Sequence, residues 1–268
     1  MNGNPGALVF KHDRNDQLYV FVAGGDGDVQ VRFWNVPAGT WQWDDRGGVD
    51  RVSLGSPSAA HNRLNPNAPE DSLLVFARGT DGALYKQDWD GTQWLNWTPR
   101  GQPVWNVQVA GRPAAAAFLA STSGDDPLFQ PDVLAFVWGE DNNVYRYSPQ
   151  HNHWSIQGAG PQVASDPAVI VQPIGANTHI VHAYVIGNDG HLWASSATDS
   201  LGQHYAWHNL GIPGPTITRN IRPGLALLGR LRAFVRSDDG HLWAHSWGGW
   251  NDASAGQWTD LGTPPGVP

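Results

Sequence analysis

Two arginines and a set of aromatic residues stand at matching places in similar stretches of this sequence. Arg78 and Arg236 each come three residues before an Asp-Gly pair, and aromatic residues follow each of them. A guanidinium group carries fixed N–H donors, and an aromatic ring offers a flat apolar face. Together these groups suit a ligand that has hydroxyl groups and an apolar C–H surface. The pattern therefore indicates binding chemistry.

A third, similar stretch has His191 directly after its Asp-Gly pair and two tryptophans beyond it. We expect ligand contacts from all three stretches. The candidate binding residues are Arg78, Tyr85 and Trp97, then His191, Trp193 and Trp207, and finally Arg236, Trp243 and Trp258.

Each candidate can also have a purely structural role, and the sequence leaves both the binding role and the structural role open. Arg78 and Arg236 can pair with an Asp of a neighbouring unit, and His191 and His241 can be exposed turn residues. The aromatic residues can serve packing, because each ring buries on the order of 150 to 250 Å². Residues that can be core or can clamp an outer strand are Trp97, Trp193, Trp207, Trp243 and Trp258.

The candidates belong to a repeat. Five copies align on a turn whose first residue is Asp, which we call the turn aspartate, and the copies are separated by 55, 60, 48 and 50 residues. An aromatic residue precedes every turn aspartate by five positions. The turn aspartates are Asp26, Asp81, Asp141, Asp189 and Asp239. The aromatic residues are Phe21, Phe76, Phe136, Tyr184 and Phe234.

Each copy predicts four short strands in about 50 residues, which is typical of a β-propeller blade. Asp-Gly favours tight hairpins, and the 32 Gly and 20 Pro support an all-β chain. We expect one five-bladed β-propeller domain over residues 1–268, with four antiparallel strands per blade. Each copy begins at a first strand and ends at a fourth, so any closure of the ring joins whole blades. The expected blades are 5–52, 53–108, 109–163, 164–218 and 219–264.

Composition excludes several classes of partner. The net charge of −8 provides no basic surface for phosphates, so we expect neither nucleic acid nor an anionic membrane as partner. No apolar run reaches the length of a membrane span, and residues 1–10 do not have a signal-peptide pattern. Cysteine is absent, so packing must hold the fold.

The copy from Leu73 to Tyr85, with Trp89, Trp94 and Trp97 after it, resembles the repeat of bacterial propeller lectins of the Photorhabdus type, which bind fucose and related sugars. The resemblance is close in blades two, four and five. The count of five blades resembles the tachylectin-2 architecture. These resemblances imply non-catalytic, multivalent binding of glycans at sites in or between blades, on extracellular or cell-surface glycoconjugates. An Arg at the place of Arg78 commonly meets sugar oxygens in such lectins.

Two blades have diverged from the repeat and are expected to be empty. Gln30 replaces the aromatic residue of the third strand in blade one, and Asn142 replaces the turn glycine in blade three.

We expect no metal ion or other cofactor. His151 and His153, and likewise His179 and His182, have spacings that suit a metal, but no Cys or Glu stands near them. Solvated histidines are the favoured interpretation.

Hydrolysis is disfavoured, and we expect no catalytic residues. Glycoside cleavage needs acids that face one bond, whereas the expected innermost strands carry no Asp or Glu and the chain has only two Glu, Glu70 and Glu140. Two alternatives stay open. One is a protein-interaction propeller, although the Gly-His and Trp-Asp signature of common interaction repeats is missing. The other is a lectin-like enzyme with pericyclic chemistry in the central cavity.

Overall fold

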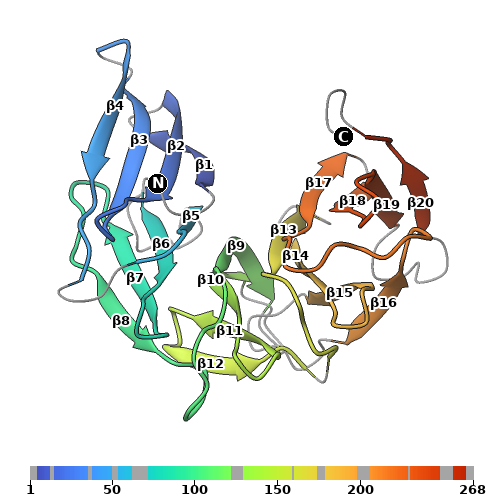
Figure 1. The fold of residues 1–268 in the computed structure, drawn as a ribbon. Helices are drawn as coiled ribbons and strands as arrows, with labels where there is room; N and C mark the ends of the chain where they lie inside the picture. Colours follow the sequence, from blue (N-terminus) through green and yellow to red (C-terminus); the bar gives the residue numbers. More distant parts are fainter. Residues whose placement is uncertain are drawn as a thin grey trace.

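A computed structural model describes most of the chain. The described residues are 5–12, 15–35, 38–49, 54–61, 72–121, 129–158, 160–173, 179–197, 206–228, 230–247 and 256–263. They form five separate sheets of four antiparallel strands, each built from consecutive strands. The predicted all-β, five-bladed propeller fold is confirmed (Figure 1).

Each sheet is one blade, numbered here in chain order. Blade 1 contains β1 (Gly6–His12), β2 (Asn15–Ala23), β3 (Val29–Asn35) and β4 (Thr40–Asp45). Blade 2 contains β5 (Ser58–His61), β6 (Leu73–Arg78), β7 (Leu84–Trp89) and β8 (Thr98–Gly101). Blade 3 contains β9 (Ala114–Ser121), β10 (Phe129–Trp138), β11 (Val144–Ser148) and β12 (His153–Ile156). Blade 4 contains β13 (Ala168–Pro173), β14 (His179–Ile186), β15 (Leu192–Ala197) and β16 (Trp207–Gly211). Blade 5 contains β17 (Gly224–Leu228), β18 (Arg230–Arg236), β19 (Leu242–Trp247) and β20 (Gln257–Asp260).

The repeated turn joins the second and third strand of every blade. Its second residue has a positive φ of 90° at Gly27, 74° at Gly82, 77° at Gly190 and 87° at Gly240. Asn142 takes this place in blade 3 with a φ of 62°. Asn is one of the few other residues that tolerate the left-handed region, so the turn survives the substitution.

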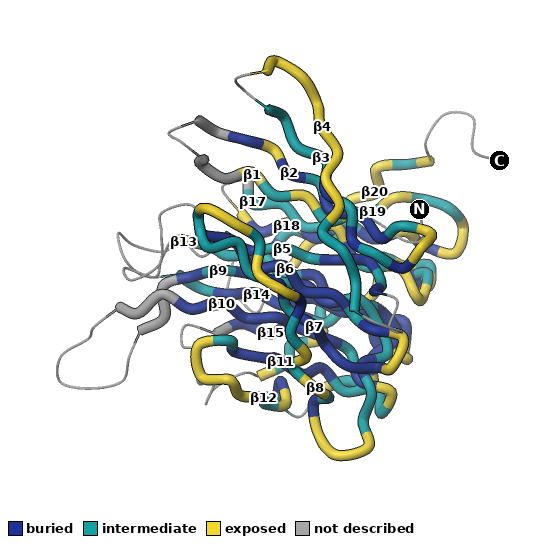
Figure 2. The backbone as a smooth tube through the Cα atoms, turned by 90° about the vertical axis from the view of Figure 1, so that its left-hand side faces the viewer, coloured by how far each residue is buried: buried dark blue, intermediate teal, exposed yellow. Residues whose placement is uncertain are grey.

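The aromatic residue before each turn packs toward the following blade. Phe21, Phe76, Phe136 and Tyr184 are at most 1% exposed. They lie within or beside four hydrophobic clusters, one between each pair of consecutive blades from 1–2 to 4–5. Both faces of blades 2, 3 and 4 are therefore buried, and the clusters hold the blades together without disulfides. Figure 2 shows the buried residues along the middle strands and the exposed β4 at the edge.

A tryptophan of the outer strand joins each blade to the one before it. The indole N–H of Trp97, Trp154, Trp207 and Trp258 donates to a backbone carbonyl of the preceding blade at 2.5 to 3.3 Å. The acceptors are the carbonyls of Arg46, Arg100, Gln157 and Leu210. Each acceptor lies three residues after the tryptophan of its own blade. We call this contact the tryptophan clamp, and it is the structural role that the sequence left open.

The ring is open. The innermost strands contact one another in the series β1, β5, β9, β13 and β17, and Figure 1 shows an opening between blade 1 and blade 5. None of the hydrophobic clusters formed by the described residues joins these two blades. In the part of the chain that the structure describes, blades 1 and 5 consequently have one face each without a neighbouring blade.

No helix among the described residues is long and apolar enough to span a membrane.

The clamp contributes to stability. We expect Trp154→Phe to lower the free energy of unfolding by about 1 kcal/mol or more, because the hydrogen bond to the Arg100 carbonyl is lost and the phenyl ring fills less space than the indole. The matched control is Trp43→Phe, because Trp43 has the same place in blade 1 but no blade before it. Urea unfolding measures both. Equal losses in the two variants would contradict a clamp.

A buried carboxyl group makes stability depend on pH. Burial raises the pKa of Asp132 to about 6, against smaller opposing effects of the Val133 N–H, His151, Ser148 and Arg146. The unfolded chain loses this proton near pH 4. Ionisation of Asp132 therefore lowers the stability of the folded state as pH rises from about 4 to 6, and the cost is complete above pH 6.

We expect Asp132→Asn to be more stable than the parent at pH 7, by up to about 3 kcal/mol, and equally stable at pH 4. Burial lowers the pKa of His182 and of His245 to about 4. These two histidines therefore make the folded state more stable as pH rises from about 4 to 6.5, which opposes the effect of Asp132. The quantity to measure is thus the difference in the free energy of unfolding between Asp132→Asn and the parent at each pH. A difference that does not vary with pH would contradict the assignment.

Candidate functional site

A shallow pocket of about 220 Å³ lies between blades 1 and 2, beside their repeated turns. The linker between the blades forms its floor: the Leu54 N–H donates to the Gly27 carbonyl at 2.8 Å, and the Gly55 N–H to the Arg78 carbonyl at 2.7 Å. These bonds hold the two blades and the linker together. The lining residues are Gly24, Gly25, Gly27, Leu54, Gly55, Arg78 and Thr80.

Two side chains of the repeat are missing at this junction. Gly25 directly precedes its turn aspartate, a place that the other copies fill with Thr80, Glu140, Asn188 and Asp238. Gly55 stands in the linker where the later linkers have Ala110, Ala164 and Thr218. A Cβ atom at Gly25 would meet no heavy atom within 4 Å, so this glycine borders open space.

Arg78 is the one predicted residue that lines the pocket. It is partly buried at the end of β6, and its Nε donates to the Val109 carbonyl in the linker after blade 2. This bond orients the guanidinium group and leaves its other N–H donors available to a ligand. The contact that anchors the Arg78 side chain is therefore this bond to a backbone carbonyl, and not the ion pair with an Asp that the sequence also allowed.

Tyr85 and Trp97 lie in the core between blades 1 and 2, below the pocket. The Tyr85 hydroxyl donates to the Asp81 carboxylate at 2.7 Å, and burial followed by this bond raises the Tyr85 pKa to about 12. Tyr145 makes the same bond to Asp141. The aromatic residue of the third strand thus holds its own turn aspartate, which is the packing role that the sequence left open.

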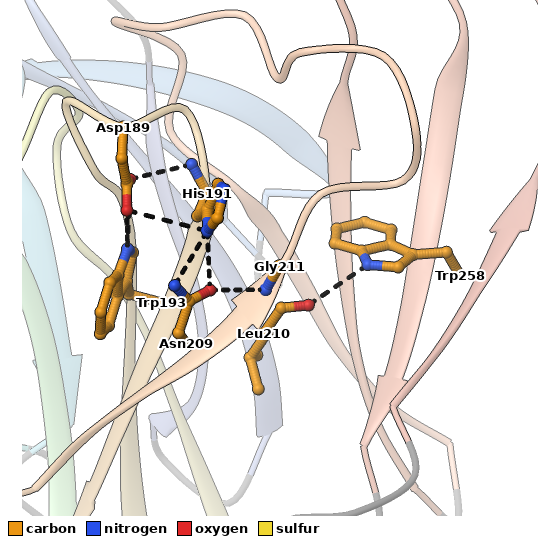
Figure 3. A network of polar contacts seen from close by, with 7 residues as sticks. All are labelled: Asp189, His191, Trp193, Asn209, Leu210, Gly211 and Trp258. Atoms are coloured by element: carbon orange, nitrogen blue, oxygen red, sulfur yellow. Dashed lines mark hydrogen bonds and ion pairs between the residues drawn. The ribbon is translucent and has the colours of Figure 1, made fainter.

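The candidates of blade 4 form a polar network at the molecular surface (Figure 3). The Trp193 indole donates to the Asp189 carboxylate at 3.1 Å, and the His191 backbone N–H donates to the same group. The His191 Nδ1 lies 3.0 Å from the Asn209 side-chain oxygen. His191 and Asp189 are partly exposed, at 35% and 42% of their side chains. Trp207 lies apart from the network and serves as the clamp to blade 3.

Blade 5 repeats this arrangement with a carboxylate in place of the amide. The His241 Nδ1 lies 3.0 Å from the Asp260 carboxylate, and the Trp243 indole donates to Ser237. Trp258 is the clamp to blade 4. Arg236 is exposed at the end of β18, on the face of blade 5 that has no neighbouring blade.

The structure therefore separates the candidates by role. Arg78 borders a pocket, His191 borders an exposed polar network, and Arg236 lies on an open face. The other six lie in blade interfaces or bond to their own turns. Sequence reasoning missed the glycines of the pocket, with Leu54 and Thr80. Comparison of the copies could have found them, since Gly25 and Gly55 stand where other copies have side chains.

The lining residues include no carboxylate, so the pocket has no acid or base for hydrolysis. Among the described residues, no group of three or more His, Asp or Glu side chains could hold a metal ion. The pocket can bind a small ligand through backbone groups, an arginine and a threonine hydroxyl.

The fold and this junction define a β-propeller with a pocket between blades. Neither a protein-family model nor a curated protein sequence matches the chain. Solved structures do match it. One is a variant of the Aleuria aurantia lectin in complex with α-methyl-L-fucoside, at 12% identity, with 97% of this chain and 78% of that chain covered and a TM-score of 0.61. Another is the SapL1 lectin in complex with α-methyl fucoside, at 16% identity, 97% and 80% coverage and a TM-score of 0.58.

A third structure is the Aleuria aurantia fungal lectin, described as a six-bladed β-propeller with a novel fucose recognition mode. It matches at 15% identity, 98% and 80% coverage and a TM-score of 0.60. At these identities the likeness shows the fold.

The bond from tyrosine to turn aspartate can be tested directly. We expect Tyr85→Phe and Tyr145→Phe each to lower the free energy of unfolding by about 1 kcal/mol, because each removes one partly buried hydrogen bond and leaves the ring in place. Urea unfolding of the two variants checks this. A loss in only one of them would show that the two bonds are not equivalent parts of the repeat.

Proposed function

We propose that this protein is a lectin that binds a fucoside or a related sugar, without catalysis, in the pocket between blades 1 and 2. The pocket beside Arg78, open where two side chains of the repeat are absent, carries the proposal. Structures of the same fold contain bound fucosides, which supports this class of ligand.

The chemistry of the pocket suits a monosaccharide. Its volume of about 220 Å³ is small, and its glycines let a sugar ring approach the backbone closely. The free N–H groups of Arg78 and the Thr80 hydroxyl can bond to sugar hydroxyl groups. No acid lies in the lining to cleave a glycosidic bond, which supports binding over hydrolysis.

Further sites are proposed at the turns of blades 4 and 5. His191 with Asn209, and His241 with Asp260, are polar pairs at equivalent places of the two blades. Several weak sites on one rigid ring would bind a glycan-bearing surface more tightly than any single site. We infer that such surfaces, outside or on cells, are the natural target. The resemblance to the Photorhabdus type is part of this proposal.

Filling the pocket should weaken binding. We expect Gly25→Leu to weaken binding of α-methyl-L-fucoside by about tenfold or more, equivalent to about 1.4 kcal/mol, because the new side chain would occupy the pocket. Its backbone does not need a positive φ and its Cβ meets no atom within 4 Å, so the fold should tolerate the change. Isothermal titration calorimetry measures the affinity, and a thermal melt checks the fold.

The matched control is Trp105→Ala, which removes a 91% exposed tryptophan in the linker after blade 2 and should leave binding unchanged. Arg78→Ala should weaken binding like Gly25→Leu, although it also removes the bond to Val109. Undiminished binding in Gly25→Leu would exclude this pocket as the site. Absence of binding by the parent, at high protein concentration and across a glycan array, would count against the lectin itself.

A further inference from the structure

Three consecutive blades carry a charged residue at one repeated place. A proline precedes the first strand of each blade, and the residue directly before that proline is Arg112 in blade 3, Asp166 in blade 4 and Arg222 in blade 5. In blade 2 the same place holds the uncharged Ser56. A residue before proline is restricted to extended backbone, so its side chain leaves each blade at a similar position. We call Arg112, Asp166 and Arg222 the pre-proline cluster.

The pre-proline cluster lies at the inner edge of the ring. Its residues lead into β9, β13 and β17, which are innermost strands, and β13 contacts the other two (Figure 1). The first residue of each of these strands pairs with the aromatic residue that stands five positions before a turn aspartate, as Ala168 does with Tyr184 and Gly224 with Phe234. The cluster is therefore at the end of the ring that carries the repeated turns.

The one carboxylate of the cluster is bound to Arg112. The Arg112 backbone N–H donates to one Asp166 carboxylate oxygen at 2.8 Å, and the Arg112 Nε lies 3.3 Å from the other oxygen. A Cβ atom at Gly111 would lie 2.0 Å from this carboxylate, so the glycine leaves room for it. The Asp166 side chain is 12% exposed, whereas the Arg112 side chain is 36% exposed. Asp166 is therefore held in place, and Arg112 remains accessible to a ligand.

Arg222 reaches past blade 4 to the start of blade 3, where its Nη2 donates to the Pro113 carbonyl at 2.7 Å. Its Nε is buried and donates to no acceptor among the residues that the structure describes. Burial lowers the pKa of Arg222, the charge of Asp166 opposes this effect, and the like charge of Arg112 adds to it. Within the described part of the chain, Arg222 thus bonds to a neutral carbonyl and has no carboxylate of its own.

Two guanidinium groups and one carboxylate leave the cluster with an excess positive charge, in a chain whose net charge is −8. A charge that is partly removed from water is costly until an opposite charge and hydrogen bonds compensate it. A neutral glutamine could make the bond to Pro113, so that bond alone does not account for the charge of Arg222. The planar guanidinium group matches a carboxylate with two parallel N–H···O bonds. The arrangement therefore favours a carboxylate as the missing partner.

We propose that Arg222 and Arg112 form a binding site for the carboxylate group of a ligand, at the inner edge of blades 3 to 5. The carboxylate belongs to an acidic sugar or to a free carboxylic acid, which present the same group to the two arginines. None of the residues that line the pocket between blades 1 and 2 belongs to this site. The proposal therefore stands independently of fucoside binding.

Isothermal titration calorimetry at low ionic strength tests the site with three probes: glucuronate, acetate and the neutral methyl glucoside. We expect the parent to bind at least one of the two acids and not the methyl glucoside. Arg222→Gln should weaken binding of the acid by about tenfold or more, because it removes the charge and the paired N–H donors. The matched control is Arg219→Gln, which removes the same charge from an exposed residue of the same linker and should leave binding unchanged.

A thermal melt with and without the acid supplies a second readout, because a bound ligand raises the melting temperature. The acid should stabilise the parent and Arg219→Gln but not Arg222→Gln. If Arg222→Gln does not fold, Arg222→Lys keeps the charge and should still bind several-fold more weakly than the parent. Tighter binding of glucuronate than of acetate would assign the site to acidic sugars, and equal binding would assign it to free carboxylic acids.

Three outcomes would overturn the proposal. The parent could bind neither acid, which would leave the Arg222 bond to Pro113 as a purely structural tie. The two glutamine variants could lose affinity equally, which would show a general effect of net charge. α-Methyl-L-fucoside could compete with the acid for the same site, which would place the acid in the pocket between blades 1 and 2. Fucoside binding that is unchanged in Arg222→Gln keeps this test separate from that of the proposed lectin function.

Discussion

Packing of one blade against the next is the interaction on which this structure depends. The chain has no cysteine, so nothing covalent holds the ring. Each junction between consecutive blades combines an apolar cluster with an aromatic residue at a fixed distance from the turn, and a tryptophan N–H that reaches the preceding blade. The hydrogen bond gives each junction a defined register, whereas the apolar cluster provides most of the buried surface.

The proposed binding site follows from a local departure from this repeat. At the first three junctions the linker donates a backbone hydrogen bond to each of the two blades. Only at the first does glycine replace the residue before the turn and the small residue in the linker, which leaves the pocket beside Arg78. This junction therefore differs from the other three by two side chains that the other copies have and it lacks.

The opening is the opposite case, because there the packing residues are present and their partners are not. Leu18, Trp43 and Leu242 are exposed and Phe234 is partly buried, although their equivalents in the other blades pack against a neighbouring blade. Both open faces also carry charge: Arg230, Arg232 and Arg236 alternate along β18, and Asp28 lies near Asp45 in blade 1.

The sequence alone determined the fold, because the turn and the aromatic residue five positions before it recur five times, each with a tryptophan further on, in units of about 50 residues that hold four short strands. It also identified Arg78 as a binding candidate, since selective presence in a few copies differs from structural recurrence. The sequence could not assign a role to Tyr85, Trp97 or Trp258, because an aromatic side chain that binds a ligand and one that packs in the core have the same residue type and spacing. Only the tertiary structure decided that these side chains face neighbouring blades or their own turns. The curvature, and with it the opening, was likewise decided there, because the angle between blades depends on how whole faces fit together and leaves no mark in local spacing.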